Sequence, residues 1–185
     1  MADPEKRSAV GFLADQHDEI RELFAQLTDA YPSERRAVFE RLVRLLSVHE
    51  TAEELVVHPA ARTAGTDATA VVEARLAEED RAKKMLADIE KHDPASARFA
   101  ALLPGLREAV ESHARHEERE LFPLLEAVSD ERQLQRMTSA LELAESIAPT
   151  HPHKRAPESA IGNLLVGPVV SVVDRVRDML RNVAR

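Results

Sequence analysis

The sequence of 185 residues contains no cysteine, only five glycines and few aromatic residues, which make up 3% of the chain. The absence of cysteine excludes disulfides, thiol chemistry and iron–sulfur ligation, and it fits a reducing compartment, so we expect a cytoplasmic protein. The low glycine and aromatic content disfavours β-sheet, whereas alanine, leucine, glutamate and arginine are abundant. We therefore expect an all-α protein.

Two further absences limit the partners. The net charge is −8 and the sequence has no basic run, so the chain is a poor candidate for nucleic-acid binding. The longest apolar run, Leu164 to Val173, is interrupted by Gly167 and Pro168 and is too short to cross a bilayer. The first residues, Met1 to Lys6, are polar and do not form the hydrophobic region of a signal peptide. We expect neither nucleic acid nor a membrane as a partner.

The sequence does contain one pattern twice. His49-Glu50-Thr51-Ala52-Glu53-Glu54 and His113-Ala114-Arg115-His116-Glu117-Glu118 share the form His-x-x-x-Glu-Glu, and Pro59 and Pro123 follow the two copies at the same distance. Residues four apart lie on one face of an α-helix, so the histidine and the first glutamate of each copy converge. An imidazole and a carboxylate that converge in this way suit a metal ion, and a carboxylate can bridge two ions. The repetition favours a metal site over the alternative, ordinary solvated helix faces.

Apolar residues spaced by threes and fours predict the main helices at about residues 8–30, 33–57, 70–91 and 106–128. Pro59 is expected to end or bend the second helix. A short helical segment should precede the last of them and end near Leu102, with a break or kink at Pro104. Short connections make neighbouring helices antiparallel, so the sequence predicts an up-down-up-down four-helix bundle over residues 8–128.

Residues 129–185 are predicted to form a C-terminal helical extension, with helices at about residues 130–147 and 168–184. Pro168 suits the first position of the second of these. We interpret this extension as packing on the bundle or as a contact for a homodimer or a protein partner.

The internal repeat includes the first and third helices. Alignment of the two halves pairs His17 with Glu79, and it pairs the apolar stripe that follows each residue. Glu79 is flanked by Glu78 and Asp80, either of which could replace it if the helix rotates slightly. We therefore expect the candidate ligands to meet at one level of the bundle.

The order of these residues resembles the hemerythrin-like HHE cation-binding family over about residues 8–128. The resemblance rests on a histidine in the first helix, two His-x-x-x-Glu motifs and a Leu-Phe-Pro segment: His17, His49, Glu53, His113, Glu117, Glu118 and Leu121-Phe122-Pro123.

This resemblance implies a non-haem di-iron centre within the bundle, with an open position for dioxygen, hydrogen peroxide or an oxo or hydroxo bridge. One iron would be held by His17 and His49. The other would be held by His113 and Glu79, and Glu53 and Glu117 would bridge the two ions.

The third helix departs from the oxygen-carrying members of the family, which place histidines there. Glu79 holds one of those positions and Lys83 holds the other. A carboxylate-rich site favours the ferric state, so reversible oxygen transport is not expected, and manganese is an alternative occupant. Some iron-sensing relatives have a glutamate directly after the histidine of the second helix, as Glu50 is here, so Glu50 is a secondary ligand candidate. Asp80 is another, because it could replace Glu79 if the third helix rotates slightly.

Three functions remain open at this stage. The first is a catalase- or peroxidase-like reaction with peroxide or dioxygen, in oxidative stress or iron handling. The second is sensing or binding of iron or oxygen without turnover. The third is a metal-free helical scaffold with a vestigial motif.

Nearby polar residues are expected to have supporting roles. His58 precedes Pro59 as Phe122 precedes Pro123, and this equivalence indicates packing. His116 is expected at the edge of the bundle. Glu54 and Glu118 are expected to pair with basic side chains such as those of Arg44 and Arg115.

Overall fold

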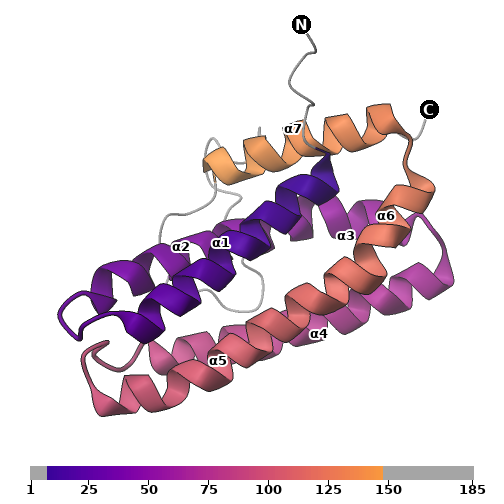
Figure 1. Ribbon diagram of the computed structural model, residues 1–185. Coiled ribbons are helices and arrows are strands. Elements are labelled where there is room, and N and C mark those ends of the chain that lie inside the picture. Colours follow the sequence, from indigo (N-terminus) through magenta and orange to yellow (C-terminus); the bar gives the residue numbers. More distant parts are fainter. Residues whose placement is uncertain (1–7, 148–185) are drawn as a thin grey trace, which may run out of the picture.

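The computed structural model describes residues 8–147, and within that range the chain is helical with short connections. The first and third rods of the bundle are single helices, α1 (Ala9–Asp29) and α4 (Thr66–Ile89). The other two each contain a π-helical turn: α2 (Arg35–Ala52), η1 (Glu53–Val57) and α3 (His58–Arg62), then α5 (Ala97–His116), η2 (Glu117–Leu121) and α6 (Phe122–Val128). Figure 1 shows the four rods side by side in antiparallel succession. The predicted all-α four-helix bundle is confirmed.

Local signals in the sequence set the starts of three helices. The Ser8 hydroxyl accepts a hydrogen bond from the backbone N–H of Gly11, and the Ser96 hydroxyl accepts one from Phe99, so both serines act as N-caps. Gly65 precedes α4 with φ at 109°, in the left-handed region that favours glycine. These residues fix where the rods begin.

Each π-helical turn ends two residues before a proline. Pro59 and Pro123 cannot donate a backbone hydrogen bond, and their rings would clash with the carbonyl four residues earlier in a regular helix. A wider turn relieves this conflict: the N–H groups of His58 and Phe122 bond to the carbonyls five residues earlier, those of Glu53 and Glu117. The rod therefore continues through Pro59 to Arg62, although the sequence alone left an end or a bend open.

The predicted break at Pro104 is wrong. This proline lies inside α5, which runs without interruption from Ala97 to His116. Pro104 and Ala100, whose carbonyl loses its usual donor, both lie on the exposed face of the helix. Water can solvate that carbonyl, so the helix tolerates the proline.

The hydrophobic core is divided into two clusters. One, at the α7 end, includes Leu13, Val56, Leu121 and Leu141. The other, toward the α1–α2 turn, includes Phe24, Leu42, Phe99 and Leu106. Buried polar residues fall between the two sets in every rod, so the bundle has a polar layer enclosed by apolar packing.

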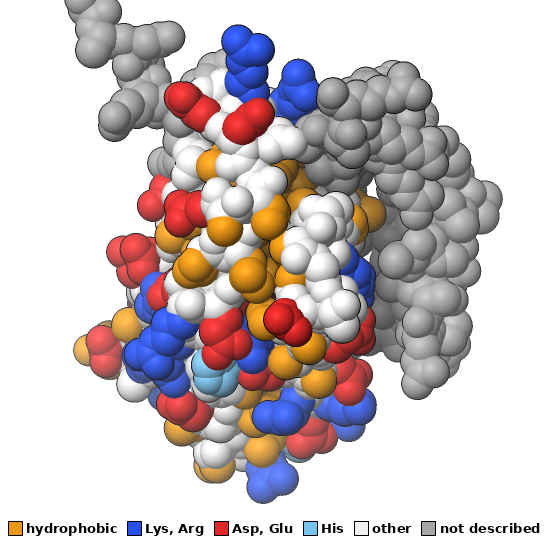
Figure 2. Space-filling model, turned by 90° about the vertical axis from the view of Figure 1, so that its right-hand side faces the viewer, with side chains coloured by type: hydrophobic (Ala, Val, Ile, Leu, Met, Phe, Trp, Pro, Cys, Tyr) orange, Lys and Arg blue, Asp and Glu red, His pale blue; other side chains and the backbone are white. Residues whose placement is uncertain are grey.

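The helix α7 (Glu131–Ile147) packs on α1, α2 and η1 through a stripe that includes Met137, Ala140, Leu141 and Ala144. This agrees with the predicted helix at residues 130–147. The second predicted C-terminal helix, at about residues 168–184, lies outside the described residues. On the face drawn in Figure 2, acidic and basic side chains are interspersed. Between residues 8 and 147, no helix is long and apolar enough to cross a membrane.

Candidate metal centre

The polar layer of the bundle gathers histidines and carboxylates from all four rods. Its most buried histidines and carboxylates, each less than a tenth exposed, are His17 on α1, His49 on α2, Glu53 at the start of η1, His58 on α3, Glu79 on α4, His113 on α5 and Glu117 at the start of η2. The expectation that the candidate groups meet at one level is therefore met. The two i, i+4 pairs converge as predicted, with Nε2 to carboxylate distances of 3.4 Å for His49–Glu53 and 3.5 Å for His113–Glu117.

Three imidazoles in this layer are oriented in the same way. The Nδ1 atom of His17 lies 2.9 Å from Oε1 of Glu118, that of His49 lies 2.9 Å from Oε1 of Gln16, and that of His113 lies 3.2 Å from Oε2 of Glu78. Each Nδ1 therefore carries the proton and donates it. The Nε2 atom of each ring is then left with a lone pair directed into the bundle, which is the usual arrangement of metal-binding histidines.

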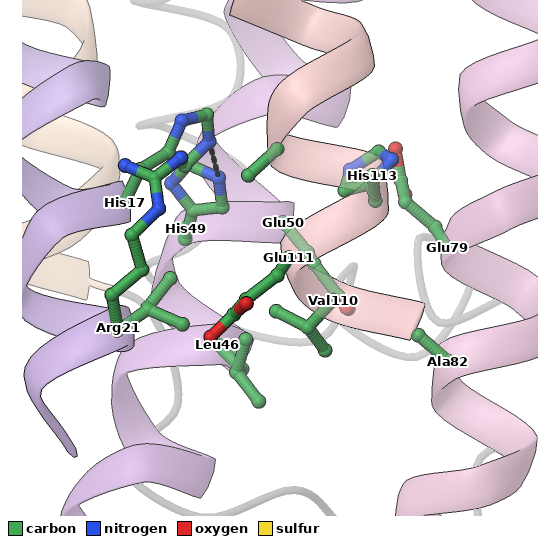
Figure 3. A pocket seen from close by; sticks show the side chains of 12 residues that line it. His17, Arg21, Leu46, His49, Glu50, Glu79, Ala82, Val110, Glu111 and His113 are labelled. Carbon is green, nitrogen blue, oxygen red and sulfur yellow. Dashed lines mark hydrogen bonds between the residues drawn. The ribbon is translucent and has the colours of Figure 1, made fainter. Parts of the chain in front are cut away.

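The two Nε2 atoms of His17 and His49 lie 3.1 Å apart (Figure 3). With both Nδ1 atoms protonated, two lone pairs face each other, which is unfavourable without a proton or a cation between them. Neighbouring ligands of one metal ion lie at about this separation, since metal–nitrogen bonds are about 2.0–2.1 Å long. The geometry suits a shared cation.

Several carboxylate oxygens of the layer are buried without a hydrogen bond. Among the residues that the structure describes, no donor hydrogen-bonds to either oxygen of Glu53 or Glu117, or to Oε1 of Glu79. The Nε2 atom of His113 and both ring nitrogens of His58 are likewise unpaired. Buried polar atoms normally have partners, and one without a partner costs about 1–3 kcal/mol. Metal cations would satisfy these atoms together, so the residues present fit such a group.

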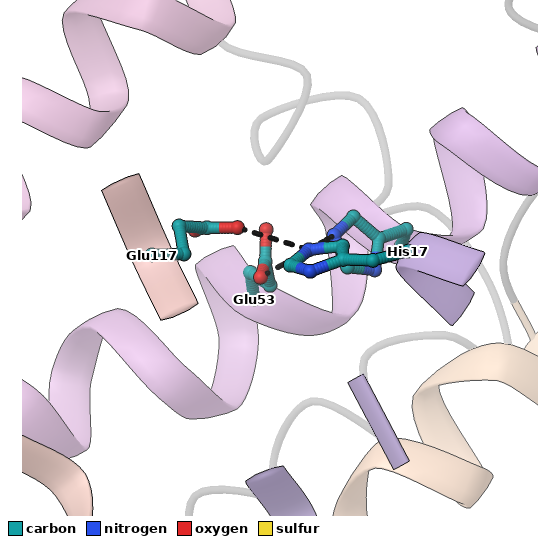
Figure 4. A group of neighbouring side chains, drawn as sticks. His17, Glu53 and Glu117 are labelled. Carbon is teal, nitrogen blue, oxygen red and sulfur yellow. Dashed lines mark hydrogen bonds and ion pairs between the residues drawn. The ribbon is translucent and has the colours of Figure 1, made fainter. Parts of the chain in front are cut away.

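The ligand atoms form two overlapping groups. His17, His49, Glu53 and Glu117 offer atoms that all lie within 4.8 Å of one another, and so do Glu53, His58 and Glu79. Glu53 belongs to both groups, as a bridging carboxylate would. Figure 4 shows Glu53 and Glu117 converging on His17, whose Nε2 lies 3.2 Å from Oε2 of Glu117. His113 lies outside both groups, beside Glu117.

Burial and mutual repulsion shift the titration of these groups in the metal-free protein. Burial and then the nearby His17 together lower the pKa of His49 to about 3. Burial, then the charges of Glu117 and Glu79, raise the pKa of Glu53. Burial alone would raise the pKa of Glu117, but contact with His17 and the nearby histidines lowers it to about 2. Neutral imidazoles are the form that binds metals.

The secondary candidates lie outside the two groups. Asp80 is largely exposed and pairs with Lys84. Glu50 is directed toward Lys83, at 3.4 Å, and burial raises its pKa to about 7 despite this ion pair. The structure thus brings five of the six principal candidates into the two groups and places the sixth, His113, beside Glu117, whereas Asp80 and Glu50 are directed elsewhere.

Several expected supporting contacts have different partners. Glu54 pairs with Lys83 at 2.9 Å, not with Arg44 or Arg115, because Lys83 of α4 faces it across the bundle. The carboxylate of Glu78 contacts the Nδ1 atoms of both His113 and His116, and the distance to His116 is 2.8 Å. It also forms an ion pair with Arg75. His116 is at the edge of the bundle, as expected.

His58 is the residue that the sequence analysis missed. It is buried, and its Nε2 lies 3.4 Å from Oε1 of Glu79. In a regular helix His58 would point away from Glu53, but the π-helical turn brings residues five apart onto one face. The available signal was Pro59, which widens the turn.

A small cavity of about 20 Å³ adjoins the cluster. Its polar lining includes His17, His49, Glu50, Glu79 and His113, and its apolar lining includes Leu46, Ala82 and Val110. Figure 3 shows His17 and His49 on one side of it and His113 and Glu79 on the other. A cavity of this size holds about one water-sized molecule.

The bundle and its buried cluster define the class of the protein: a helical domain with histidine and carboxylate groups compatible with binding metal cations. The family model of the hemerythrin HHE cation binding domain matches residues 8–125, and the chain belongs to this family. An uncharacterized hemerythrin-like protein of Schizosaccharomyces pombe is 28% identical over 136 residues, which is 73% of this chain and 67% of the relative.

The crystal structure of a hemerythrin HHE cation binding domain-containing protein from Mycobacterium kansasii has the same fold. Its TM-score is 0.66 at 20% sequence identity, over 91% of this chain and 98% of the other. This similarity supports the bundle architecture.

Proposed function

We propose that the protein binds two iron ions in the polar layer and that the loaded site reacts with hydrogen peroxide or dioxygen, in oxidative stress or iron handling. The observation that carries this proposal is the set of buried, unpaired carboxylate oxygens of Glu53 and Glu117, which face imidazole nitrogens already oriented by their Nδ1 hydrogen bonds. Manganese remains an alternative occupant. The cytoplasmic location expected from the sequence stays a prediction.

Each ligand would have a distinct role. His17 and His49 would hold one ion, and His113 and Glu79 would contribute to the other. Glu53 and Glu117 would bridge them. A bound iron pair would supply the electrons that cleavage of an O–O bond requires. The cavity would admit one small molecule beside the ligands, and its apolar side chains, such as Val110, would keep other water out.

The number of carboxylates in the site argues against a function in reversible oxygen transport. Three carboxylates, those of Glu53, Glu79 and Glu117, lie in the cluster. Anionic oxygen ligands stabilise ferric iron, so the site should not return intact dioxygen readily.

A second candidate function is iron or oxygen sensing without turnover. It is favoured by the cavity, which has room for about one small molecule and so suits binding of a single diatomic ligand.

One experiment tests the proposal and separates the two candidates. The purified chain is loaded with ferrous iron without oxygen, desalted, analysed for iron and then mixed with excess peroxide. Sustained oxygen evolution indicates turnover, whereas bleaching in proportion to the protein indicates binding or sensing. Glu117→Ala and His113→Ala should each lose about half of the iron or more. Full iron content in both variants would refute the ligand assignment.

A further inference from the structure

His58 is a buried histidine without a hydrogen bond. It is 1% exposed, and neither ring nitrogen has a hydrogen-bond partner among residues 8–147. A histidine buried only for packing usually donates from at least one ring nitrogen, because an unpaired donor is costly. The nearest charged atom is Oε1 of Glu79, 3.4 Å from its Nε2.

The backbone places His58 at this position for a specific reason. In η1 the N–H of His58 bonds to the carbonyl of Glu53, so the two residues are one π-helical turn apart and share a face. Glu53, His58 and Glu79 consequently offer ligand atoms within 4.8 Å of one another. Wider turns of this kind occur frequently at functional sites.

The two halves of the bundle differ in a complementary way at this point. At one place, α1 of the first repeat carries an imidazole, His17, and the ring of Phe122 after η2 of the second repeat stacks on it with centroids 5.6 Å apart and planes at 8°. At the equivalent place, α4 of the second repeat carries a carboxylate, Glu79, and the residue after η1 of the first repeat that contacts it is an imidazole, His58. The imidazole thus lies on the long helix in the first case and directly after the π-helical turn in the second.

We propose that His58 is a ligand of the second metal ion, with Glu53 and Glu79, and that it replaces the imidazole absent from the third helix. Each ion would then have two imidazoles, His17 and His49 on one and His58 and His113 on the other. This inference rests on the proposed function, because it assumes that the cluster binds two ions.

The test measures metal content, not activity. Wild-type protein and His58→Phe are loaded with ferrous iron or with zinc, desalted, and analysed for metal per chain. Phenylalanine is the residue found at the equivalent position in the other half, so the substitution should be accommodated. We expect the variant to lose about half of the bound metal, with the other ion retained. His92→Phe, in the turn after α4 and outside the cluster, is the matched control and should keep the wild-type content.

A compensating variant provides the sharper result. His58→Phe combined with Glu79→His reproduces in this half the arrangement of Phe122 and His17. If His58 binds the metal, the double variant should regain most of the metal that His58→Phe loses. Circular dichroism identifies any variant that fails to fold.

A measurement on the unaltered chain does not depend on folding of variants. Histidine side-chain ¹H–¹⁵N spectra during zinc titration report which imidazoles bind the ion. Metal-induced shifts at His17, His49, His58 and His113 support the proposal, and an unshifted His58 overturns it. Wild-type protein that binds no metal would instead refute the proposed function itself. Full metal content in folded His58→Phe would refute only the role of His58.

Discussion

The carboxylate of Glu118 joins His17 to Arg21 through a single oxygen. Its Oε1 lies 2.9 Å from Nδ1 of His17 and 2.6 Å from Nη2 of Arg21, which in turn binds Asp18 at 2.7 Å through Nη1. This chain of contacts runs from a buried imidazole to the surface of α1. Glu118 therefore fixes the tautomer of His17 and the direction of its Nε2 lone pair.

Removal of that support should weaken metal binding without removing a ligand. We expect Glu118→Ala to lower metal affinity about 10- to 100-fold, the usual effect of losing the partner of a ligating histidine. Competition with a chromophoric chelator measures the change. Glu108→Ala, at an exposed glutamate that pairs with Arg115, is the control and should leave the affinity unchanged. An equal loss in both variants would point to a general charge effect.

The carboxylate of Glu53 should have opposite effects on metal binding and on the stability of the empty bundle. Both of its oxygens are buried without a hydrogen bond, and it belongs to both ligand groups. We expect Glu53→Leu to abolish binding of the metal pair while stabilising the metal-free protein by about 1–3 kcal/mol, because an unsatisfied polar group is removed.

Thermal unfolding in the presence of a chelator, with metal analysis of the same samples, checks both effects. The conservative variant Glu53→Gln should also lose metal but should gain less stability, because its amide remains polar. A metal-free Glu53→Leu protein less stable than the wild type would contradict this account of the buried carboxylate.

The metal-free protein should lose stability between about pH 6.5 and pH 8. Burial raises the pKa of Glu79 to about 8 from the ordinary 4.5. In this window the folded state holds a proton that the unfolded state has released, so the free energy of unfolding falls as pH rises, by about 1–2 kcal/mol. Burial lowers the pKa values of His49 and His58, so these two groups act mainly below pH 6.5.

Metal binding should show the opposite dependence. Carboxylates must be deprotonated to bind a cation, so affinity should increase toward pH 8 and binding should release protons. Calorimetry in buffers of different ionisation enthalpy counts these protons, and melting curves of the metal-free protein test the stability. Glu79→Gln should reduce both effects, and unchanged pH dependence in that variant would show that another group is responsible.

The sequence was sufficient for the bundle and for most of the cluster. Apolar spacing located the rods, and the i, i+4 pairs His49–Glu53 and His113–Glu117 converge because their segments are regular helix up to the glutamate. His58 lies beyond that point. Its orientation depends on a π-helical turn, and a helical period of 3.6 residues assigns it to the wrong face.

The sequence also could not predict which side chains pair with one another across the bundle. Lys83 was expected only as the residue at a lost histidine position, yet its ammonium lies 2.9 Å from Glu54 and 3.4 Å from Glu50. Long side chains can reach several neighbours on a facing helix, and only the relative rotation of the rods decides among them.

The continuous helix at Pro104 leads to a last prediction, on stability alone. Pro104 interrupts the hydrogen-bond ladder of α5 on an exposed face, far along the helix from the ligands His113 and Glu117. Pro104→Ala should restore the bond to the Ala100 carbonyl and raise the free energy of unfolding by about 1–3 kcal/mol, less than the full helix-propensity difference because proline also restricts the unfolded chain. Denaturant unfolding measures the gain, and metal content should stay at the wild-type value.

Pro123→Ala is the informative comparison, because it removes the proline that follows η2. A regular α-helical turn there would rotate Phe122 away from His17 and lower metal affinity, so a variant with an unchanged affinity would show that the π-helical turn does not depend on proline.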